Sequence, residues 1–161
     1  MCRIDKTNYY LNIAEAVAGR STCLKRQYGS IIVKNDTIIS TGFNGASRGV
    51  ESCLECGQCL RANSPRGMDY SLCLSVHSEQ NAIIHASRDQ MIDSELYLVG
   101  TQKDENGNKK YVENPAPCSL CKRMIINAGI KNVIVRIDET NFNILNVDEW
   151  KLDKNKLVGG Y

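Results

Sequence analysis

Two stretches decide how this chain folds, His77-Ser78-Glu79-Gln80-Asn81-Ala82-Ile83 and Pro117-Cys118-Ser119-Leu120-Cys121. The first begins a helix that we predict from His77 to about Arg88, because small and branched apolar residues fall on one side of it. The second begins a helix that we predict over residues 118–128, since Pro117 suits a helix start and Gly129 suits the position after a helix end. Each predicted helix therefore carries metal-binding or acidic residue types at its start.

Apolar runs on either side of these helices predict a sheet. Two β-branched runs, residues 30–33 and 37–40, are separated by Lys34-Asn35-Asp36, which favours a tight turn between paired strands. Residues 95–99 and 132–137 predict two further strands. The order strand, strand, helix, strand, helix, strand predicts an α/β fold of three layers, α/β/α, in which helices flank a central mixed sheet.

Other segments complete the expected organisation. Residues 8–19 predict an amphipathic helix with Thr7 as its N-cap. Residues 41–76 form a long Gly- and Cys-rich connection without periodicity, which in a compact domain indicates a functional or metal-clamped loop. Residues 100–114 predict a protruding hairpin or loop, and the tail from Asp138 to Tyr161 gives the weakest signal.

Size and charge limit the function classes. A chain of 161 residues with 42% hydrophobic residues predicts a single domain over 1–161, with its core from about residue 8 to 137. A net charge of +2 without a basic run argues against a polymeric nucleic acid as partner. No apolar stretch approaches the roughly 18 residues of a membrane span, and residues 1–6 are polar, so we expect a cytoplasmic protein without a membrane partner.

The chain contains 8 cysteines, which in a reducing compartment favour metal ligation or catalysis over disulfides. Most of them cluster. Cys53-Leu54-Glu55-Cys56-Gly57-Gln58-Cys59 holds three thiols, and Cys118 and Cys121 form a C-x-x-C. Clustering of this kind predicts metal sites rather than isolated structural thiols.

The two helix starts together predict a catalytic zinc site. Cys118 and Cys121 leave the same face of a first helical turn, where the helix dipole favours thiolates. With His77 they give zinc three ligands and leave a fourth position for water, as catalytic zinc requires. Glu79 lies beside these ligands and would act first as general base and then as general acid. H-x-E followed by P-C-x-x-C is the known signature of zinc-dependent base deaminases, which act on the carbon bearing the exocyclic amine.

The same residues also allow simpler interpretations. A C-x-x-C alone also occurs in structural zinc knuckles and redox pairs, but the preceding Pro117 and the upstream H-x-E favour catalysis. A zinc-stabilised binding module without activity would not need Glu79. His85 differs from His77 in helical phase by about 80° and is interpreted as a packing or interface residue.

From about Tyr9 to Ile137 the sequence resembles the deoxycytidylate deaminase family within the cytidine deaminase superfamily. The likeness is carried by short motifs: Arg20-Ser21-Thr22-Cys23, Gly29-Ser30-Ile31-Ile32-Val33, Thr41-Gly42-Phe43-Asn44-Gly45, Val76-His77-Ser78-Glu79-Gln80-Asn81-Ala82-Ile83 and Pro117-Cys118-Ser119-Leu120-Cys121. The resemblance implies a cytidine deaminase-like domain that hydrolyses dCMP to dUMP with release of ammonia, supplying a precursor for thymidylate synthesis.

The resemblance also implies roles for single residues. In the family the Asn of the G-F-N-G element contacts the nucleotide sugar, which implies that Asn44 binds substrate. A basic residue before the first hairpin strand contacts the phosphate, which implies that Arg26 does so. Arg88 falls where the family places a residue tied to effector response, and the resemblance allows dCTP and dTTP as effectors. It further implies a homo-oligomer, often a hexamer.

Several microbial members hold a second, structural zinc in the loop before H-x-E. Transferred to the cysteine-rich zinc loop 50–76, that resemblance implies a closed site formed by Cys23, Cys53, Cys59 and Cys73, with Cys56 as a spare or substitute. The sequence leaves open whether Cys56 or Cys59 is the ligand. Free thiols beside a disordered loop are the alternative.

Two departures from the family pattern concern specificity. The usual H-A-E is His77-Ser78-Glu79 here, a small-for-small change that we expect to leave the chemistry intact. The inserted loop 101–116 precedes P-C-x-x-C and could reshape base or phosphate specificity. Alternatives therefore stay open: another cytosine or 5-substituted cytosine nucleotide, a nucleoside, which would not need Arg26, and a nucleic-acid editing deaminase. A bifunctional vitamin-pathway deaminase would usually be longer and lack G-F-N-G.

Overall fold

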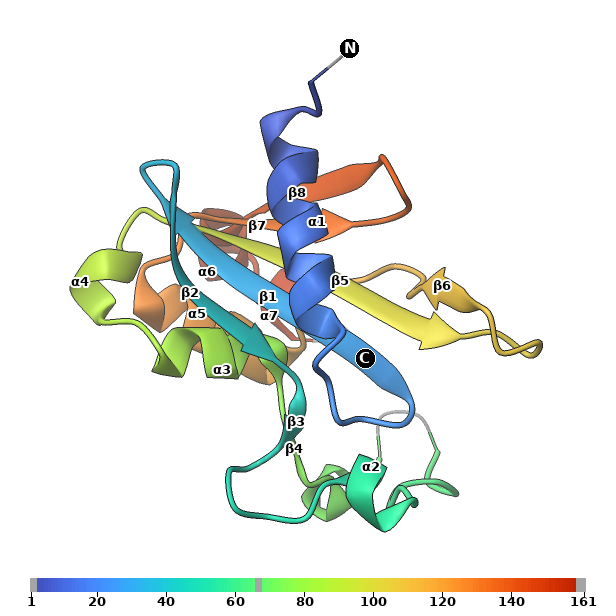
Figure 1. Cartoon of the computed structure of the whole chain (residues 1–161). Helices are drawn as coiled ribbons and strands as arrows, with labels where there is room; N and C mark the ends of the chain where they lie inside the picture. Colours follow the sequence, from blue (N-terminus) through green and yellow to red (C-terminus); the bar gives the residue numbers. More distant parts are fainter. Residues whose placement is uncertain (1–2, 66–67, 159–161) are drawn as a thin grey trace.

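A computed structural model describes residues 3–65 and 68–158 of the chain. Its strands are β1 Arg26–Lys34, β2 Thr37–Phe43, β3 Gly45–Ala46, β4 Ser75–Val76, β5 Glu95–Lys103, β6 Lys109–Tyr111, β7 Asn132–Arg136 and β8 Phe142–Asn146. The main sheet has the order β2-β1-β5-β7-β8, with β6 paired to β5, and β3 and β4 form a separate two-stranded ladder (Figure 1). β5 and β7 are parallel, whereas the other described pairs of the main sheet are antiparallel.

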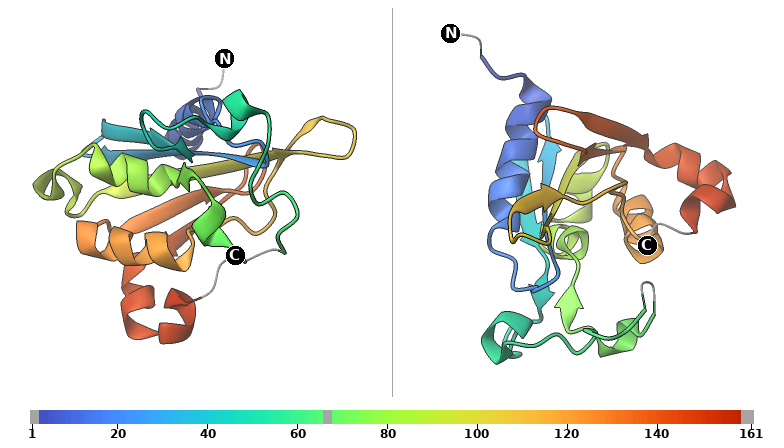
Figure 2. Two further views of the ribbon diagram at one scale, coloured as in Figure 1. Left: turned by 90° about the horizontal axis from the view of Figure 1, so that it is seen from below. Right: turned by 90° about the vertical axis from the view of Figure 1, so that its right-hand side faces the viewer.

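Helices cover both faces of this sheet. They are α1 Lys6–Ala18, α2 Cys53–Cys56, a 3-10 turn at Tyr70–Leu72, α3 Ser78–Ile84, α4 Arg88–Met91, α5 Ser119–Ala128, α6 Val147–Leu152 and α7 Lys154–Leu157. Two views at right angles show α1 on one face of the sheet and α3 and α5 on the other (Figure 2). The three-layer α/β/α prediction with a mixed sheet is therefore confirmed.

Side chains that alternate along the strands form one hydrophobic core on each face of the sheet. Ile32, Leu96 and Leu98 are fully buried on the face that also holds Cys121 and Ile125 of α5. Their neighbours in sequence point to the opposite face and pack with α1: this second core contains Tyr10, Leu11, Ala14, Ile31, Val33, Tyr97, Val99 and Ile134. Because successive side chains of a strand point to opposite faces, one apolar run serves both layers.

The predicted elements exist, but several of their limits are different. The N-cap of α1 is Asp5, whose Oδ1 accepts a hydrogen bond of 2.9 Å from the Asn8 amide, and not Thr7. The helix predicted to reach Arg88 ends at Ile84, because Ser87 caps a separate short helix, α4. β1, β2 and β5 extend beyond the predicted runs, since ladder hydrogen bonds continue through polar residues. The tail forms β8, α6 and α7.

Close approach of α3 to the sheet depends on Gly42. A Cβ atom there would lie 2.3 Å from the Ser78 carbonyl oxygen and 2.3 Å from the Ala82 nitrogen, distances that no structure tolerates. The missing side chain thus lets α3 lie directly on β2 and brings its first turn over the end of the sheet. His77 and Glu79 are placed by this contact.

Residues 101–116 contribute a hairpin in which β6 returns alongside β5, as expected for a protruding element (Figure 1). Its tip is closed by Asp104, whose Oδ1 accepts hydrogen bonds from the amides of Asn106 and Asn108. Gly107 adopts a φ of 81°, which favours glycine at this turn. Across the described ranges, no helix has both the length and the apolar character needed to cross a membrane.

Candidate active site and metal centre

The starts of α3 and α5 meet at one place. His77 is the N-cap of α3 and Cys118 is the N-cap of α5. The Nδ1 atom of His77 lies 3.4 Å from the Cys118 Sγ and 3.4 Å from the Cys121 Sγ. The ligand atoms of the three residues all lie within 4.8 Å of one another, so the structure brings the three predicted ligands together.

Local hydrogen bonds fix these ligands. The His77 amide donates to the Gln80 Oε1 at 3.0 Å, and the Cys121 amide points to the Cys118 sulfur at 3.5 Å. Both cysteines are buried, with 6% of Cys118 and none of Cys121 exposed. One imidazole and two thiolates fit Zn²⁺ with a fourth position open, which is the ligand set of catalytic rather than structural zinc.

A hydrogen bond between the two thiols shifts their pKa values in opposite directions. A hydrogen bond from the Cys121 thiol lowers the pKa of Cys118 to about 3, and His77 acts in the same direction. The same hydrogen bond, together with burial, raises the pKa of Cys121. The bond to Cys118 also raises the pKa of His77. The pair therefore carries one negative charge readily, and a bound dication would stabilise the second thiolate.

Glu79 lies in the first turn of α3 and is 5% exposed. Burial raises its pKa, against the opposing effects of the His77 charge and a hydrogen bond from Ser78. The Ser78 Oγ donates to the Glu79 Oε2 at 3.0 Å, and the Ser30 Oγ lies 2.8 Å from the Ser78 Oγ. A buried carboxyl with a raised pKa beside three metal-binding side chains is suited to move protons.

Sequence reasoning missed the contribution of Ser30 and Ser78. Ser78 was expected to act only as a small residue, and Ser30 was one letter of an apolar strand. The signal was a hydroxyl in the middle of H-x-E, but its partner on β1 is 48 residues away and becomes visible only in the folded chain.

Asn44 is buried, and its side chain connects the residue after β2 to Ser21 and to the start of β1. Its Oδ1 accepts hydrogen bonds from the Ser21 hydroxyl at 2.6 Å and from the Tyr28 amide at 2.7 Å. Its Nδ2 donates to the Arg26 carbonyl at 3.0 Å, which uses one of its two N–H groups. The two predicted substrate residues are thus direct neighbours. The Arg26 Nε donates to the Gln102 Oε1 at 3.0 Å, so the inserted segment reaches the predicted phosphate contact.

The cysteines of the zinc loop lie near one another but do not form a closed ligand set. Cys23, Cys53, Cys59 and Cys73 are partly buried free thiols, and Cys56 is exposed. Burial first, and then the charges of the other four, raise the pKa of Cys53, which places all five in one neighbourhood. Within residues 3–65 and 68–158, the one group of three or more potential metal ligands whose atoms all lie within 4.8 Å of one another is His77, Cys118 and Cys121.

Arg88 and His85 lie outside this ligand set. The Arg88 Nε donates to the Asn127 carbonyl at 3.0 Å, near the end of α5, where a cation complements the helix dipole. His85 is exposed, with Nδ1 2.9 Å from the Thr41 carbonyl oxygen and Nε2 2.9 Å from the Arg48 guanidinium. His85 thus joins α3 to neighbouring segments of the chain.

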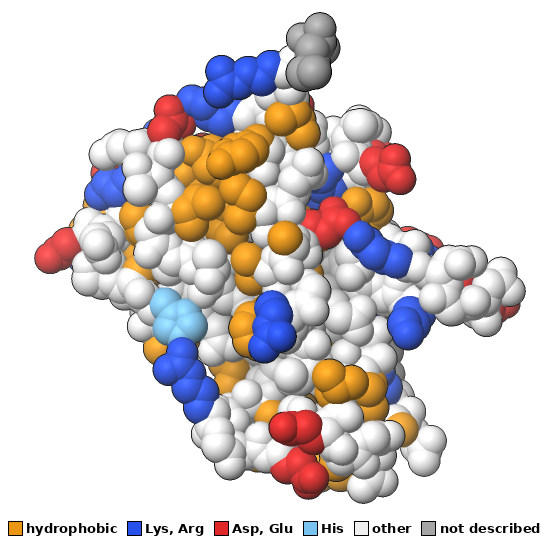
Figure 3. Space-filling view, viewed as in Figure 1, with side chains coloured by type: hydrophobic (Ala, Val, Ile, Leu, Met, Phe, Trp, Pro, Cys, Tyr) orange, Lys and Arg blue, Asp and Glu red, His pale blue; other side chains and the backbone are white. Residues whose placement is uncertain are grey.

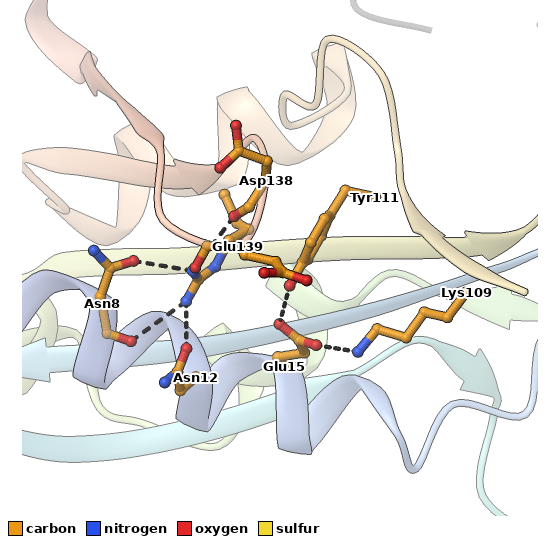
Figure 4. Close-up of polar contacts among 8 residues, drawn as sticks. Asn8, Asn12, Glu15, Lys109, Tyr111, Asp138 and Glu139 are labelled. Carbon is orange, nitrogen blue, oxygen red and sulfur yellow. Dashed lines mark hydrogen bonds and ion pairs between the residues drawn. The ribbon is translucent and has the colours of Figure 1, made fainter. Parts of the chain in front are cut away.

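A second buried polar centre lies on the opposite face of the sheet (Figure 4). Arg136 of β7 is 1% exposed, and its guanidinium donates to Asn8 Oδ1 at 2.9 Å and to Asn12 Oδ1 at 2.6 Å. Beside it, Glu15 of α1 pairs with Lys109 and accepts a hydrogen bond of 2.8 Å from the Tyr111 hydroxyl. These contacts attach α1 to β7 and to the hairpin. They border an open hollow of about 680 Å³ lined by Asn12, Glu15, Ala16, Lys109, Lys110, Tyr111 and Glu139.

Comparisons with known proteins agree with the site. Residues 4–137 match the family model for the cytidine and deoxycytidylate deaminase zinc-binding region. The deoxycytidylate deaminase of Mycobacterium phage D29 is 33% identical over 138 residues, which cover 83% of this chain and 96% of that protein. The deoxycytidylate deaminase of Saccharomyces cerevisiae is 31% identical over 142 residues, 86% of this chain, but only 41% of the longer yeast protein. The apo crystal structure of dCMP deaminase from cyanophage S-TIM5 superimposes with a TM-score of 0.59 at 25% identity, covering 84% of this chain and 86% of that one.

Proposed function

Because this chain belongs to the cytidine and deoxycytidylate deaminase family, we propose that it hydrolyses dCMP to dUMP and ammonia, a step that supplies thymidylate synthesis. Its phage relative is named a deoxycytidylate deaminase, and the chain covers 96% of that relative. The yeast relative bears the same name, but the chain spans 41% of it. The observation that carries the proposal is the buried carboxyl of Glu79 beside the cluster of His77, Cys118 and Cys121.

Four residues of the chain would carry out this reaction, three as metal ligands and Glu79 as the proton carrier. His77, Cys118 and Cys121 would hold Zn²⁺, which when bound lowers the pKa of a water molecule to about 7. Glu79 accepts a proton from water, because its buried carboxylate is a stronger base than an exposed one. Glu79 would donate this proton to the ring nitrogen as the hydroxide adds to the carbon that bears the amine. It would then take the second proton from the added hydroxyl group and donate it to the amine, which leaves as ammonia while the carbonyl of dUMP forms. The low exposure of the site keeps these protons from bulk water.

Arg26 and Asn44 provide the proposed nucleotide contacts. A guanidinium binds phosphate oxygens by charge-assisted hydrogen bonds, and the second N–H of Asn44 would reach the sugar. The hydrogen bond from the Asn44 side chain to the Arg26 carbonyl supports this proposal. It holds the first residue of β1 beside the residue that follows β2. Gln102 holds the Arg26 side chain, so the inserted hairpin would influence phosphate binding.

A second, structural zinc in the cysteine-rich loop remains part of the proposal. The mutual charge effects on Cys53 support it, since five thiols in one neighbourhood exceed what a four-ligand site needs. We expect two zinc ions per purified chain by metal analysis. One zinc per chain, with Cys53, Cys59 and Cys73 alkylated in the native protein, would contradict the second site.

Oligomer formation and effector binding complete the proposal. Apolar side chains gather on the surface between α1 and the β1–β2 hairpin (Figure 3). Ile4 and Tyr9 are about half exposed, and Ile13 and Ile38 are partly buried, a surface that suits contact with a second copy. Arg88 is the proposed link to dCTP and dTTP. Light scattering at several protein concentrations, and turnover with each nucleotide added, test the two statements.

An ammonia-release assay tests the function itself. The substrates are dCMP, CMP, deoxycytidine, dCTP and a short single-stranded DNA, each with and without added dCTP as activator. We expect the highest kcat/KM on dCMP and no turnover of the DNA. A preference for deoxycytidine would overturn the nucleotide assignment, and turnover of the DNA would favour an editing deaminase.

A further inference from the structure

Two buried serine hydroxyls form a chain of hydrogen bonds that ends on Glu79. Ser30 of β1 and Ser78 of α3 are both fully buried, and their Oγ atoms are 2.8 Å apart. The Ser78 Oγ donates to the Glu79 Oε2 at 3.0 Å. A serine has one hydroxyl hydrogen, so Ser78 must accept from Ser30 when it donates to Glu79. The direction is therefore Ser30 to Ser78 to Glu79.

The chain of hydroxyls lies where α3 packs closely against the central strands of the sheet. Ser30 lies between Gly42 of β2 and Leu98 of β5 in the ladder of the sheet. The bare Cα of Gly42 lets the first turn of α3, with Ser78, approach the same strand pair. Both hydroxyls are thus held by backbone on three neighbouring elements.

We propose that Ser78, supported by Ser30, is a positioning residue that holds one oxygen of the Glu79 carboxylate and leaves the other for proton transfer. The role rests on the proposed deamination, since it concerns the proton carrier of that reaction. A carboxylate can rotate about its last bond, whereas one fixed oxygen allows a single orientation. Misplacement of a reacting group by about 1 Å can cost a factor of roughly 100 in rate. The serine of H-S-E therefore does more than preserve the size of the usual alanine.

The competing explanation is that Ser78 merely satisfies the buried hydroxyl of Ser30. The two explanations differ in a double variant. Ser78→Ala leaves the Ser30 hydroxyl buried without its partner, which lowers stability, while Ser30→Ala/Ser78→Ala removes both groups and avoids that cost. If Ser78 positions Glu79, the double variant should recover the wild-type Tm, but its kcat should stay low.

Ser40→Ala is the matched control. The Ser40 hydroxyl is also buried and donates to the Ala82 carbonyl of α3 at 2.8 Å, one turn beyond Ser78. Like Ser78→Ala, this substitution removes a buried hydroxyl from the contact between the sheet and α3. We expect Ser40→Ala to keep the wild-type kcat.

The experiment measures kcat, KM, zinc content and Tm for wild type, Ser30→Ala, Ser78→Ala, the double variant and Ser40→Ala. We expect Ser78→Ala to lower kcat by about ten- to a hundredfold, with KM within about twofold and zinc retained. The double variant should regain Tm but keep the low kcat, and Ser30→Ala alone should lose less.

Several results would overturn the positioning role: wild-type kcat in Ser78→Ala, recovery of kcat together with Tm in the double variant, an equal loss in Ser40→Ala, or loss of zinc. The rates are taken on the nucleotide that the wild type deaminates fastest. If that nucleotide is not dCMP, the proposed substrate fails while the comparison of variants still decides the role of Ser78. Absence of any wild-type turnover contradicts the proposed function itself.

Discussion

The two faces of the sheet each bury a polar centre, and the centres differ in what satisfies them. On the α1 face, Arg136 donates to Asn8, Asn12 and nearby carbonyl groups of its own chain. On the α3 and α5 face, His77, Cys118 and Cys121 converge on a common point with their ligand atoms turned toward one another. The first centre joins elements of the protein, which satisfies the guanidinium except for its buried Nε atom. The second presents a ligand set that could hold a metal ion, as the proposed catalytic role requires.

Glu79→Gln is the sharpest test of the second centre. An amide has nearly the same shape but cannot carry protons, so we expect turnover to fall by at least about two to four powers of ten. Zinc content and Tm should stay at wild-type values, because Glu79 is not among the predicted ligands. Near-normal turnover in this variant would refute the proposed mechanism.

Arg136→Met tests the first centre, with the opposite expected outcome. The change leaves the buried Asn8 oxygen without its donor, at a cost of about 1–3 kcal/mol, whereas the exposed Asn12 can hydrogen-bond to water. We expect the free energy of unfolding to fall by about 1–3 kcal/mol, measured by urea denaturation, with kcat unchanged in the folded protein. Arg123→Met, which removes an exposed arginine of α5, is the control and should cost less than about 0.5 kcal/mol. A large loss of kcat without loss of stability would show that the two faces are not separate in function.

Arg26→Ala separates substrate binding from chemistry within the catalytic face. A phosphate contact by one arginine is worth roughly 1.5–3 kcal/mol, so kcat/KM on dCMP should fall by about one to two powers of ten. Deoxycytidine has no phosphate, and its turnover should change little. Equal losses on the two substrates would mean that Arg26, through Gln102, holds structure rather than phosphate.

Glu15→Gln is expected to have the smallest effect and to depend on pH. Burial raises the pKa of Glu15, but the hydrogen bonds from Lys109 and Tyr111 outweigh it and hold the pKa below the usual 4.5. A lowered folded pKa stabilises the protein above the unfolded pKa, and this contribution is lost as pH falls through the folded value. Since Glu15 is partly exposed, we expect a cost of about 0.2–1 kcal/mol at pH 7. The cost should shrink as the pH falls below the ordinary glutamate pKa and should vanish below the lowered pKa of folded Glu15. Glu113→Gln, at an exposed pair with Lys110, is the control and should change the free energy of unfolding at pH 7 by less than about 0.5 kcal/mol.

The catalytic centre could be predicted from the sequence because its parts are local. Pro117, the C-x-x-C and the glycine after the helix determine where α5 begins and ends, and H-x-E determines the start of α3. The convergence of both starts was implied by the H-x-E and P-C-x-x-C signature of zinc-dependent deaminases. Their separation along the chain was no obstacle, since each half carries its own motif.

The structural centre could not be predicted because its partners are remote. Arg136 stood in an apolar run and bonds Asn8, 128 residues away. Nothing near Arg136 in sequence indicates that a buried cation is needed. Asp5 was missed as a cap for another reason: Thr7 and Asp5 are both good capping residues, and only the backbone decides between them. The lengths of β1 and β5 were underestimated, because backbone pairing continues to the polar residues Arg26 and Gln102, beyond the apolar runs.

The parallel pairing of β5 and β7, the one such pairing in the part of the main sheet that the structure describes, determines where the proposed site can form. α3, followed by the short helix α4, leads into β5, and α5 leads into β7, so two strands that run the same way require two helices that run the same way. Their positive ends then arrive at one edge of the molecule. Had β7 run in the opposite direction, a helix of 10 residues would carry its cysteines to the far edge, about 15 Å away from His77. The direction of one strand is therefore as necessary to the proposed zinc site as any of its ligands.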